Sequence, residues 1–323
     1  MITPEQVTLA YQLLLGREPE SNEIINNLCQ TTHSIAQLRE TFVRSAEFRQ
    51  RMGELLDKNQ HVQLRHPFHL PNIPVEVDVP NDVLAKMFNR IKHEWEYLGG
   101  TEPYWSTITQ PQYHRDQFEG NREQFYQSGK YVVDLFLASL RRNGINPEKI
   151  LTLLEVGSGV GRVTQHLARN FKSITAADIS NAHLEITKSQ IQSQNIENVE
   201  YLHWSDPRQV QGLKTVDAIL SVITLQHNSP PVMVWLLKNL LRALNNNGVA
   251  YIQIPTYKNG YLFESQRYLE TSQPNSLEMH FLPQYEVFKI IEDSDCVCLE
   301  IREDGMVGDE SVMLSNTFLI QKH

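Results

Sequence analysis

The strongest chemical signal in the sequence is a glycine-rich turn from Gly157 to Gly161, which directly follows the apolar run Leu153–Val156. Glycine permits a tight turn and lets the backbone approach a ligand that a larger side chain would exclude. A helix is predicted over residues 162–171, and its N-terminus would face the same ligand. The turn therefore predicts a ligand site, and the residues around it decide which ligand.

The next predicted strand ends at Asp178. A carboxylate at that position can bind the two ribose hydroxyls of a nucleoside, which dinucleotides and other nucleoside cofactors share. Dinucleotide-binding turns carry a further glycine three residues after the second glycine of the pair. Arg162 stands at that distance from Gly159. The pyrophosphate pattern is therefore broken, which disfavours a nicotinamide-dependent oxidoreductase.

A histidine follows a later strand, at the edge of the sheet where ligands of open α/β folds bind. His227 lies in the segment 223–231, after the strand predicted over residues 216–222. Histidine titrates near neutral pH and can take a proton from a reacting hydroxyl. We interpret His227 as the candidate general base; the alternative is that it caps the following helix or lines the ligand pocket.

The elements that position these groups are predicted from residue 150 onward, where short apolar β-rich runs alternate with amphipathic helical segments. This alternation is typical of a doubly wound parallel sheet. Strands are predicted over residues 150–156, 173–178, 199–203, 216–222, 248–254, 296–302 and 315–321. A short polar stretch joins the last two, so they should pair antiparallel. The expected fold is α/β, a Rossmann-like, mostly parallel seven-stranded sheet with an antiparallel last strand.

Glu155 before the turn, Asp178, and the pair Ser205-Asp206 after the third strand complete a pattern that resembles the class I S-adenosylmethionine-dependent methyltransferase superfamily over residues 148–323. The resemblance implies S-adenosylmethionine as cofactor. It implies that Glu155, Gly157 and Gly159 surround the methionine part, Asp178 the ribose and Asp206 the adenine amino group. The alternative for Glu155 and Asp206 is that they are ordinary acids at strand ends. Neighbours included in the expected cofactor site are Ser158, Gly161, Ile179, Ser205 and Ile223.

The chemistry at the acceptor is narrowed by two departures from related motifs. The run 228–231 is superficially similar to the Asn-Pro-Pro-aromatic motif of enzymes that methylate bases or glutamine, but Ser229 and Val232 break it. The fifth strand ends without carboxylates, so no metal is expected. We expect O-methylation of a carbohydrate or other small polar acceptor, with His227 as base. The alternatives are N-methylation of a small-molecule amine and a noncatalytic module that binds the cofactor and recruits a partner.

Two segments are predicted to cover the acceptor: the aromatic part of a helical lid region over residues 82–147, interrupted at residues 94–105, and the insertion 257–280 after the fifth strand. Long insertions at this edge usually build lids. Aromatic rings mixed with polar groups suit a sugar, although core packing explains any single ring equally well. The predicted substrate-binding residues are Tyr104, Trp105, His114, Tyr126 and Tyr257.

A small all-α module is predicted over residues 1–57, before a proline-rich linker over residues 58–81. Thr3 with Gln6, and Ser34 with Gln37, have the spacing of capping boxes. The runs 11–19 and 44–48 resemble a short helical module of bacterial proteins that is often attached to glycan-building enzymes. The module is expected either to be a packing appendage or to bind a protein partner.

Composition limits the partners further. The chain has 323 residues and a net charge of -9, which disfavours nonspecific binding to nucleic acid, because such binding needs clustered Lys and Arg. The N-terminus lacks a basic start and an apolar stretch, and no long apolar run is present. We expect a cytoplasmic protein without membrane insertion.

Overall fold

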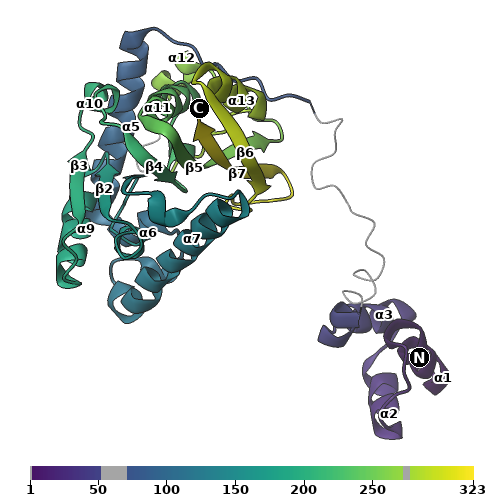
Figure 1. The fold of residues 1–323 in the computed structure, drawn as a ribbon. Helices are drawn as coiled ribbons and strands as arrows, with labels where there is room; N and C mark the ends of the chain where they lie inside the picture. The colour runs from purple at the N-terminus through teal and green to yellow at the C-terminus, as the bar shows by residue number, and fades with distance from the viewer. Residues whose placement is uncertain (1, 52–70, 272–276) are drawn as a thin grey trace. The chain divides into compact units, whose positions relative to one another are not determined.

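The computed structural model describes residues 2–51, 71–271 and 277–323. The chain divides into two compact units, Met1–Arg65 and His66–His323, which are described separately (Figure 1). The expected module end at residues 52–57 and most of the expected linker lie outside the described residues. Within the described ranges, no helix combines the length and the apolar character needed to cross a membrane.

The first unit is helical. Its elements are α1 (Pro4–Ala10), the π-helical turn η1 (Tyr11–Leu15), α2 (Asn22–Thr31) and α3 (Ile35–Val43). The Thr3–Gln6 capping box is confirmed. The second box is wrong: Ser34 accepts from the Gln37 N–H at 3.2 Å, but the Gln37 side chain accepts from the N–H of His33 instead of the cap residue.

An ion pair joins the two runs of residues that resemble the bacterial module. Arg17 donates to both carboxylate oxygens of Glu47, each at 2.7 Å, and its guanidinium lies over the Tyr11 ring. The Tyr11 ring in turn packs edge-on against Phe42 in the core of this unit. These contacts bring residues 11–19 next to residues 44–48.

The second unit is built on a seven-stranded sheet of order β3-β2-β1-β4-β5-β7-β6. Strands β1 to β5 pair with one another in parallel, and β7 is antiparallel to both β5 and β6, as predicted. The strands are β1 (Thr152–Val156), β2 (Ser173–Asp178), β3 (Val199–His203), β4 (Val216–Ser221), β5 (Leu244–Lys258), β6 (Cys296–Glu303) and β7 (Met313–Lys322). The Rossmann-like α/β fold is therefore confirmed.

Helices cover both faces of the sheet, because alternate strand residues point to opposite sides. Leu154 packs with α5, α11 and α13 in one apolar cluster, and Leu153 packs with α7 and α8 in another. The helices are α5 (Asn81–Thr101), α6 (Pro103–Thr107), α7 (Arg122–Arg142), α8 (Thr164–Leu167), α9 (Asn181–Ser193), α10 (Pro207–Gln211), α11 (Pro230–Arg242), α12 (Ser265–Glu270) and α13 (Gln284–Asp293). Short 3-10 turns lie at Pro111–Tyr113, Phe118–Asn121, Pro147–Lys149 and Leu225–His227.

Two helix predictions are corrected. The helix expected over residues 162–171 is only α8, Thr164–Leu167, because the chain continues in turns beyond it. The interruption expected at residues 94–105 is also wrong, since α5 continues to Thr101 and the break comes at Glu102. Gly99 explains the continuation: a Cβ there would collide with the Ser180 hydroxyl, so this glycine serves close packing rather than a turn.

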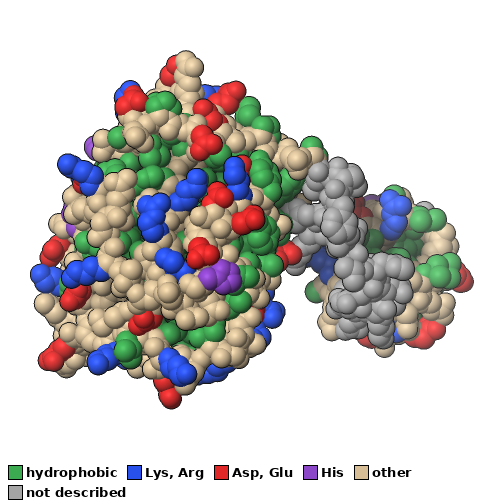
Figure 2. Space-filling view, turned by 45° about the horizontal axis from the view of Figure 1, so that its top comes forward, with side chains coloured by type: hydrophobic (Ala, Val, Ile, Leu, Met, Phe, Trp, Pro, Cys, Tyr) green, Lys and Arg blue, Asp and Glu red, His purple; other side chains and the backbone are tan. Residues whose placement is uncertain are grey.

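The visible face of the molecule in Figure 2 carries acidic and basic side chains interspersed with hydrophobic ones. No large field of a single charge sign occurs among the described residues on the face shown.

Candidate active site

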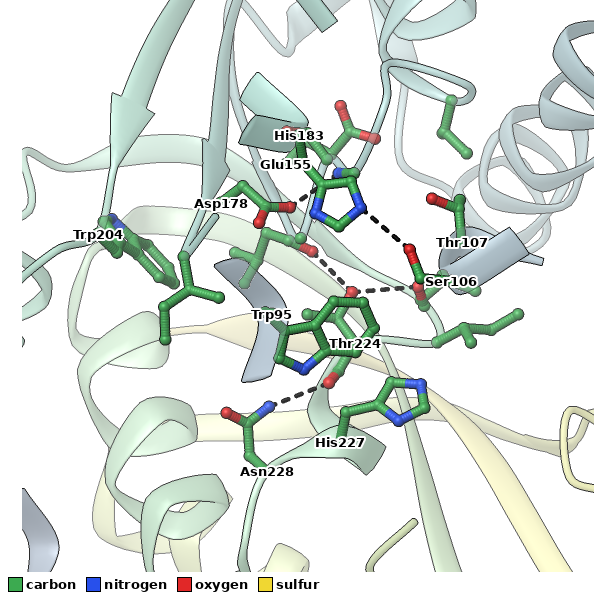
Figure 3. A pocket seen from close by; sticks show the side chains of 18 of the residues that line it. Trp95, Ser106, Thr107, Glu155, Asp178, His183, Trp204, Thr224, His227 and Asn228 are labelled. Carbon is green, nitrogen blue, oxygen red and sulfur yellow. Dashed lines mark hydrogen bonds between the residues drawn. The ribbon is translucent and has the colours of Figure 1, made fainter. Parts of the chain in front are cut away.

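A deep pocket opens at the carboxyl ends of β1, β2 and β4 and encloses, with its mouth, about 990 Å³ of empty space (Figure 3). The strands supply its floor and the helices α5 and α6 supply its cover. Its polar lining comprises Ser106, Thr107, Glu155, Ser158, Arg162, Asp178, His183, Thr224, His227 and Asn228. The apolar lining includes Phe88, Ile91, Trp95, Ile179, Trp204 and Ile223.

The glycine turn forms one wall of this pocket. Gly157, Gly159 and Gly161 all have left-handed backbones, with φ of 75°, 55° and 83°, which side chains rarely adopt. A Cβ at Gly157 would also collide with the Thr224 side chain. The main-chain N–H groups of Gly157 and Ser158 donate to the Ala177 carbonyl at 2.8 and 3.1 Å. The turn is thereby held against the end of β2.

Asp178, the last residue of β2, also holds the glycine turn against the end of this strand. Its carboxylate accepts from the Gly159 N–H at 2.8 Å and from the Ser180 N–H at 2.9 Å. Burial raises the pKa of this carboxyl group, while the nearby His183 and the backbone donors act in the opposite direction. The carboxylate is held at the pocket wall and keeps lone pairs for further donors.

Glu155 and Arg162 are buried together at the bottom of the pocket. The Thr164 hydroxyl donates to Glu155 at 2.6 Å, and burial raises the pKa of that carboxyl group to about 8. Arg162 is only 9% exposed and donates to the Ser128 hydroxyl at 3.2 Å. Its Nε has no hydrogen-bond partner among the described residues. A buried cation thus lines the pocket without a carboxylate in hydrogen-bond contact.

His227 lines the pocket from the 3-10 turn after β4. Its Nδ1 is 2.9 Å from the carbonyl oxygen of Glu278, which can only accept, so Nδ1 carries the proton and Nε2 the lone pair. Burial lowers the pKa of His227 to about 4. The imidazole is therefore neutral at physiological pH. The sequence predicted that His227 titrates near neutral pH, whereas in the structure it gains a proton only in acid.

A chain of side-chain amides orients His227. The Gln226 amide donates to the His227 Nε2 at 3.3 Å, and Gln253 on β5 donates to the Gln226 oxygen at 3.1 Å. The Gln253 oxygen accepts from the main-chain N–H of Ile223 at 2.9 Å. Ile223 has φ of 57°, a left-handed conformation that strains a β-branched residue by roughly 1–3 kcal/mol. Hydrogen bonds through Gln253 and Gln226 thus connect the strained Ile223 to the candidate base His227.

A protein-family model described as a methyltransferase domain matches residues 153–248. The match runs from β1 into β5 and includes the glycine turn, Asp178 and His227. Residues 153–248 therefore form a methyltransferase domain. No curated protein sequence matches the chain.

Solved structures similar to this methyltransferase include the magnesium protoporphyrin IX methyltransferase of Synechocystis PCC 6803 with bound SAH. It is 15% identical, with 68% of this chain and 99% of that chain covered and a TM-score of 0.47. A methyltransferase from Clostridium acetobutylicum ATCC 824 is 14% identical, with coverages of 64% and 98% and a TM-score of 0.47. One from Aquifex aeolicus is 19% identical, with coverages of 58% and 88% and a TM-score of 0.41.

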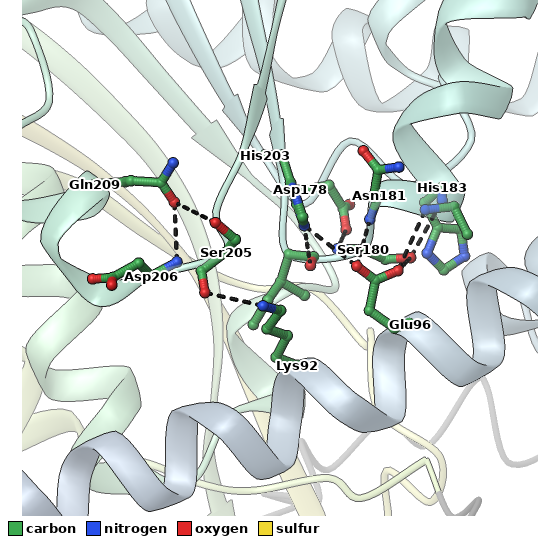
Figure 4. A network of polar contacts seen from close by, with 12 residues as sticks. Lys92, Glu96, Asp178, Ser180, Asn181, His183, His203, Ser205, Asp206 and Gln209 are labelled. Atoms are coloured by element: carbon green, nitrogen blue, oxygen red, sulfur yellow. Dashed lines mark hydrogen bonds and ion pairs between the residues drawn. The ribbon is translucent and has the colours of Figure 1, made fainter.

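Helix α5, which precedes the methyltransferase sheet in sequence, is clamped over the pocket (Figure 4). The Glu96 carboxylate accepts from the N–H of Asn181 at 3.1 Å, at the start of α9, where the helix dipole favours an anion. Lys92 donates to the Ser205 carbonyl at 3.1 Å. These contacts hold Trp95 in place, with its ring centroid 5.1 Å from that of His227.

Sequence reasoning missed the lining side chains of this cover. A lid was expected over residues 82–147, but Phe88, Ile91 and Trp95 of α5 and Thr107 of α6, which line the pocket together with Ser106, were not named as pocket residues. Ser106 forms a hydrogen bond of 3.1 Å with the buried His183. The only available signal was the apolar stripe of α5, which equally indicates a core face.

Of the predicted cofactor residues, the structure brings Glu155, Gly157, Ser158, Gly159, Asp178, Ile179, Ile223 and the candidate base His227 to the pocket lining. Gly161, Ser205 and Asp206 are not part of that lining. Asp206 forms a reciprocal capping box with Gln209 at the start of α10, and an ion pair of 2.5 Å with Arg208 lowers its pKa to about 2. The predicted adenine contact of Asp206 stays a prediction.

The predicted substrate residues are also absent from the pocket lining. The Tyr104 ring stacks on Phe118 with centroids 3.3 Å apart, and Trp105 stacks on His114 at 5.0 Å. Tyr126 is buried and donates to the Val160 carbonyl at 3.3 Å. Tyr257 lies near the end of β5. The roles predicted for these residues in acceptor binding stay predictions.

Among the described residues, no group of three or more His, Cys, Asp or Glu side chains is arranged to hold a metal ion. Metal independence stays a prediction of the sequence.

Proposed function

We propose that the methyltransferase transfers a methyl group to a hydroxyl of a carbohydrate or other small polar acceptor, with His227 taking the hydroxyl proton. The observation that supports this most directly is the state of His227. It lines the pocket, its Nδ1 donates to the Glu278 carbonyl, and its Nε2 lone pair, which accepts from the Gln226 amide at 3.3 Å, is the basic position. A hydroxyl that reaches Nε2 replaces the Gln226 amide as its hydrogen-bond donor.

The pocket residues fit S-adenosylmethionine, which supplies the methyl group on a positively charged sulfur. The glycine turn leaves room for the methionine part, and Asp178 can accept from the ribose hydroxyls. Arg162 is the natural counter-ion for the methionine carboxylate, because its guanidinium is buried at the turn without a carboxylate in hydrogen-bond contact. Trp204, whose indole N–H has no hydrogen-bond partner among the described residues, lines another part of the pocket.

The residues of the chain act mainly by alignment. Methyl transfer from a sulfonium requires acceptor, carbon and sulfur in line, and positioning supplies most of the acceleration. A neutral imidazole with a lowered pKa is a weak base, so it takes the proton only as the new bond to oxygen makes the hydroxyl acidic. The Glu278 carbonyl then stabilises the resulting imidazolium through the Nδ1 proton.

The experiment is to incubate the full chain with methyl-labelled S-adenosylmethionine and bacterial glycan or metabolite extracts, and to determine the labelled product by mass spectrometry and NMR. A labelled O-methyl group whose formation is lost in His227→Ala supports the proposal. A labelled N-methyl group supports amine methylation instead. Tight binding of S-adenosylhomocysteine with no labelled product in any extract supports the noncatalytic module.

A further inference from the structure

A second, smaller cavity lies beside the cofactor pocket, between α5, His227 and the segment that follows β5. The two cavities share Ile91, Trp95 and His227 as a common wall. The rest of the smaller cavity is lined by Glu94, Leu98, Tyr268, Leu277 and Glu278. A molecule seated in it therefore meets the candidate base at the wall that the two cavities share.

The lining has a distinct chemistry. Glu94 and Glu278 contribute carboxylates, and Trp95 and Tyr268 contribute aromatic rings. No Lys or Arg occurs among the described residues of this lining. The neutral His227 adds no positive charge.

Glu278 is kept ionised by side chains outside the cavity lining, Arg90 and His280. Arg90 pairs with its carboxylate at 2.5 Å and lies 4.0 Å from the centroid of the Tyr268 ring. Burial acts to raise the pKa of Glu278, but the hydrogen bond with His280 and the charge of Arg90 outweigh it, and the pKa is lowered. Burial raises the pKa of Tyr268, so the phenol stays neutral. Glu278 is thus an anion at physiological pH.

We propose that this cavity is the acceptor site and that the acceptor carries an ammonium group as well as the hydroxyl that is methylated. The ammonium group lies against the carboxylates of Glu94 and Glu278 and the aromatic faces of Trp95 and Tyr268, and the hydroxyl faces His227. This inference rests on the proposed function. It narrows the acceptor from small polar molecules to amino alcohols and amino sugars.

Electrostatics distinguishes acceptors that carry an ammonium group from neutral and anionic acceptors. Carboxylates and aromatic faces together form a favourable environment for a cation that has left water. An anionic acceptor would be brought out of water beside two carboxylates and a single arginine, Arg90, which pairs with Glu278, so its burial is costly. A neutral sugar would gain hydrogen bonds but no charge attraction. The order of binding expected from the site is therefore amine first, neutral next and acid last.

The test is calorimetry on the full chain saturated with S-adenosylhomocysteine, using matched probes that differ only in charge. One set is glucosamine, glucose and glucuronate, and the other is ethanolamine, ethylene glycol and glycolate. We expect the amine to bind at least about tenfold more tightly than its neutral counterpart in one set or both. Glu94→Gln and Glu278→Gln should remove that preference, while Asp82→Asn, at the exposed start of the same helix α5, should preserve it.

The proposal is overturned if no amine is preferred in either set, or if both glutamine variants keep the preference. The affinity for S-adenosylhomocysteine is measured first on each variant and separates this result from the proposed function. Failure of the wild type to bind S-adenosylhomocysteine would contradict the proposed function. Normal binding of S-adenosylhomocysteine without a preference for the amine probe would contradict only the inference about the acceptor.

Discussion

The Nδ1 atom of His227 lies 2.9 Å from the main-chain carbonyl oxygen of Glu278, a residue fifty-one positions later in the chain. This contact sets the tautomer of the candidate base and fixes the direction in which its lone pair points. It also makes the base sensitive to the segment that follows β5.

Replacing His227 should lower the rate of methyl transfer without weakening cofactor binding. His227→Ala should leave the affinity for S-adenosylhomocysteine nearly unchanged and lower the turnover rate by roughly a hundredfold or more, the usual contribution of a positioned base. Calorimetry and a steady-state assay measure the two effects. A variant with full turnover would show that His227 is structural.

The pH dependence follows from burial. Because the pKa of His227 is lowered to about 4, the neutral form is already complete near neutrality, and the wild-type rate should be flat from about pH 6 to 8. The rate should fall in acid as the imidazole gains a proton. The same shift predicts that stability declines as the pH falls from the unfolded pKa, near 6.5, towards the folded one, and that His227→Gln weakens this decline. A rate limb between pH 6 and 8 would contradict the buried, neutral imidazole.

Arg162→Gln should weaken binding only of ligands that carry the amino-acid carboxylate. Loss of a charge-assisted hydrogen bond costs about 1.5–3 kcal/mol, so the affinity for S-adenosylhomocysteine should fall by roughly tenfold to a hundredfold. The affinity for 5′-methylthioadenosine, which lacks that carboxylate, should be unchanged. Arg169→Gln, an exposed arginine nearby, is the matched control. An equal loss for both ligands would place Arg162 in structural support of the turn.

Two adjacent glycines of α5 should respond to alanine in opposite ways. A Cβ at Gly100 meets nothing within 4 Å, so Gly100→Ala should stabilise the protein by about 0.5–1 kcal/mol through helix propensity. A Cβ at Gly99 collides with the Ser180 hydroxyl and approaches His183 Nδ1 to 3.0 Å, so Gly99→Ala should lower the melting temperature. Similar shifts for the two variants would show that α5 does not pack closely on the start of α9.

A protein that starts at His66 should fold and bind S-adenosylhomocysteine like the full chain, because the two compact units have separate apolar cores. Circular dichroism and calorimetry measure this. Retained cofactor binding with lost activity towards a large glycan would support a recruiting role for residues 1–65. Loss of folding would show that the helices belong to the catalytic unit.

The sheet was predictable because each strand is a short apolar run with a turn signal at its end. The β2 and β3 bounds agree with the predicted ranges, and the glycine turn and Asp178 mark the cofactor wall in sequence. A lid was expected over residues 82–147, but the side chains of α5 that line the pocket were not predictable. Glycine in the sequence indicates a break, and only the packing of Gly99 on Ser180 shows why α5 continues through it.

Aromatic residues were the least informative for the acceptor site. Composition and spacing do not distinguish a ring that faces a cavity from one that stacks in a core, and Tyr104 stacks on Phe118 whereas Trp95 faces the pocket. Arg162 carried a clearer signal: a charged residue directly after a ligand-binding turn needs either a solvent path or a counter-ion. In this fold it is buried and its Nε has no hydrogen-bond partner among the described residues, which supports the counter-ion role proposed for it.

The amide chain from Ile223 through Gln253 and Gln226 to His227 has one more property, which is direction. Each amide donates to the next member, and Gln253 also donates to the Ser315 hydroxyl on β7 at 2.7 Å. Turning any one amide over would place two acceptors or two donors face to face, and the Ile223 N–H and the Glu278 carbonyl fix both ends, so the chain has a single favourable direction. The backbone N–H of the left-handed Ile223 therefore helps to fix the tautomer of the candidate base, through side chains that lie in the middle of the sheet.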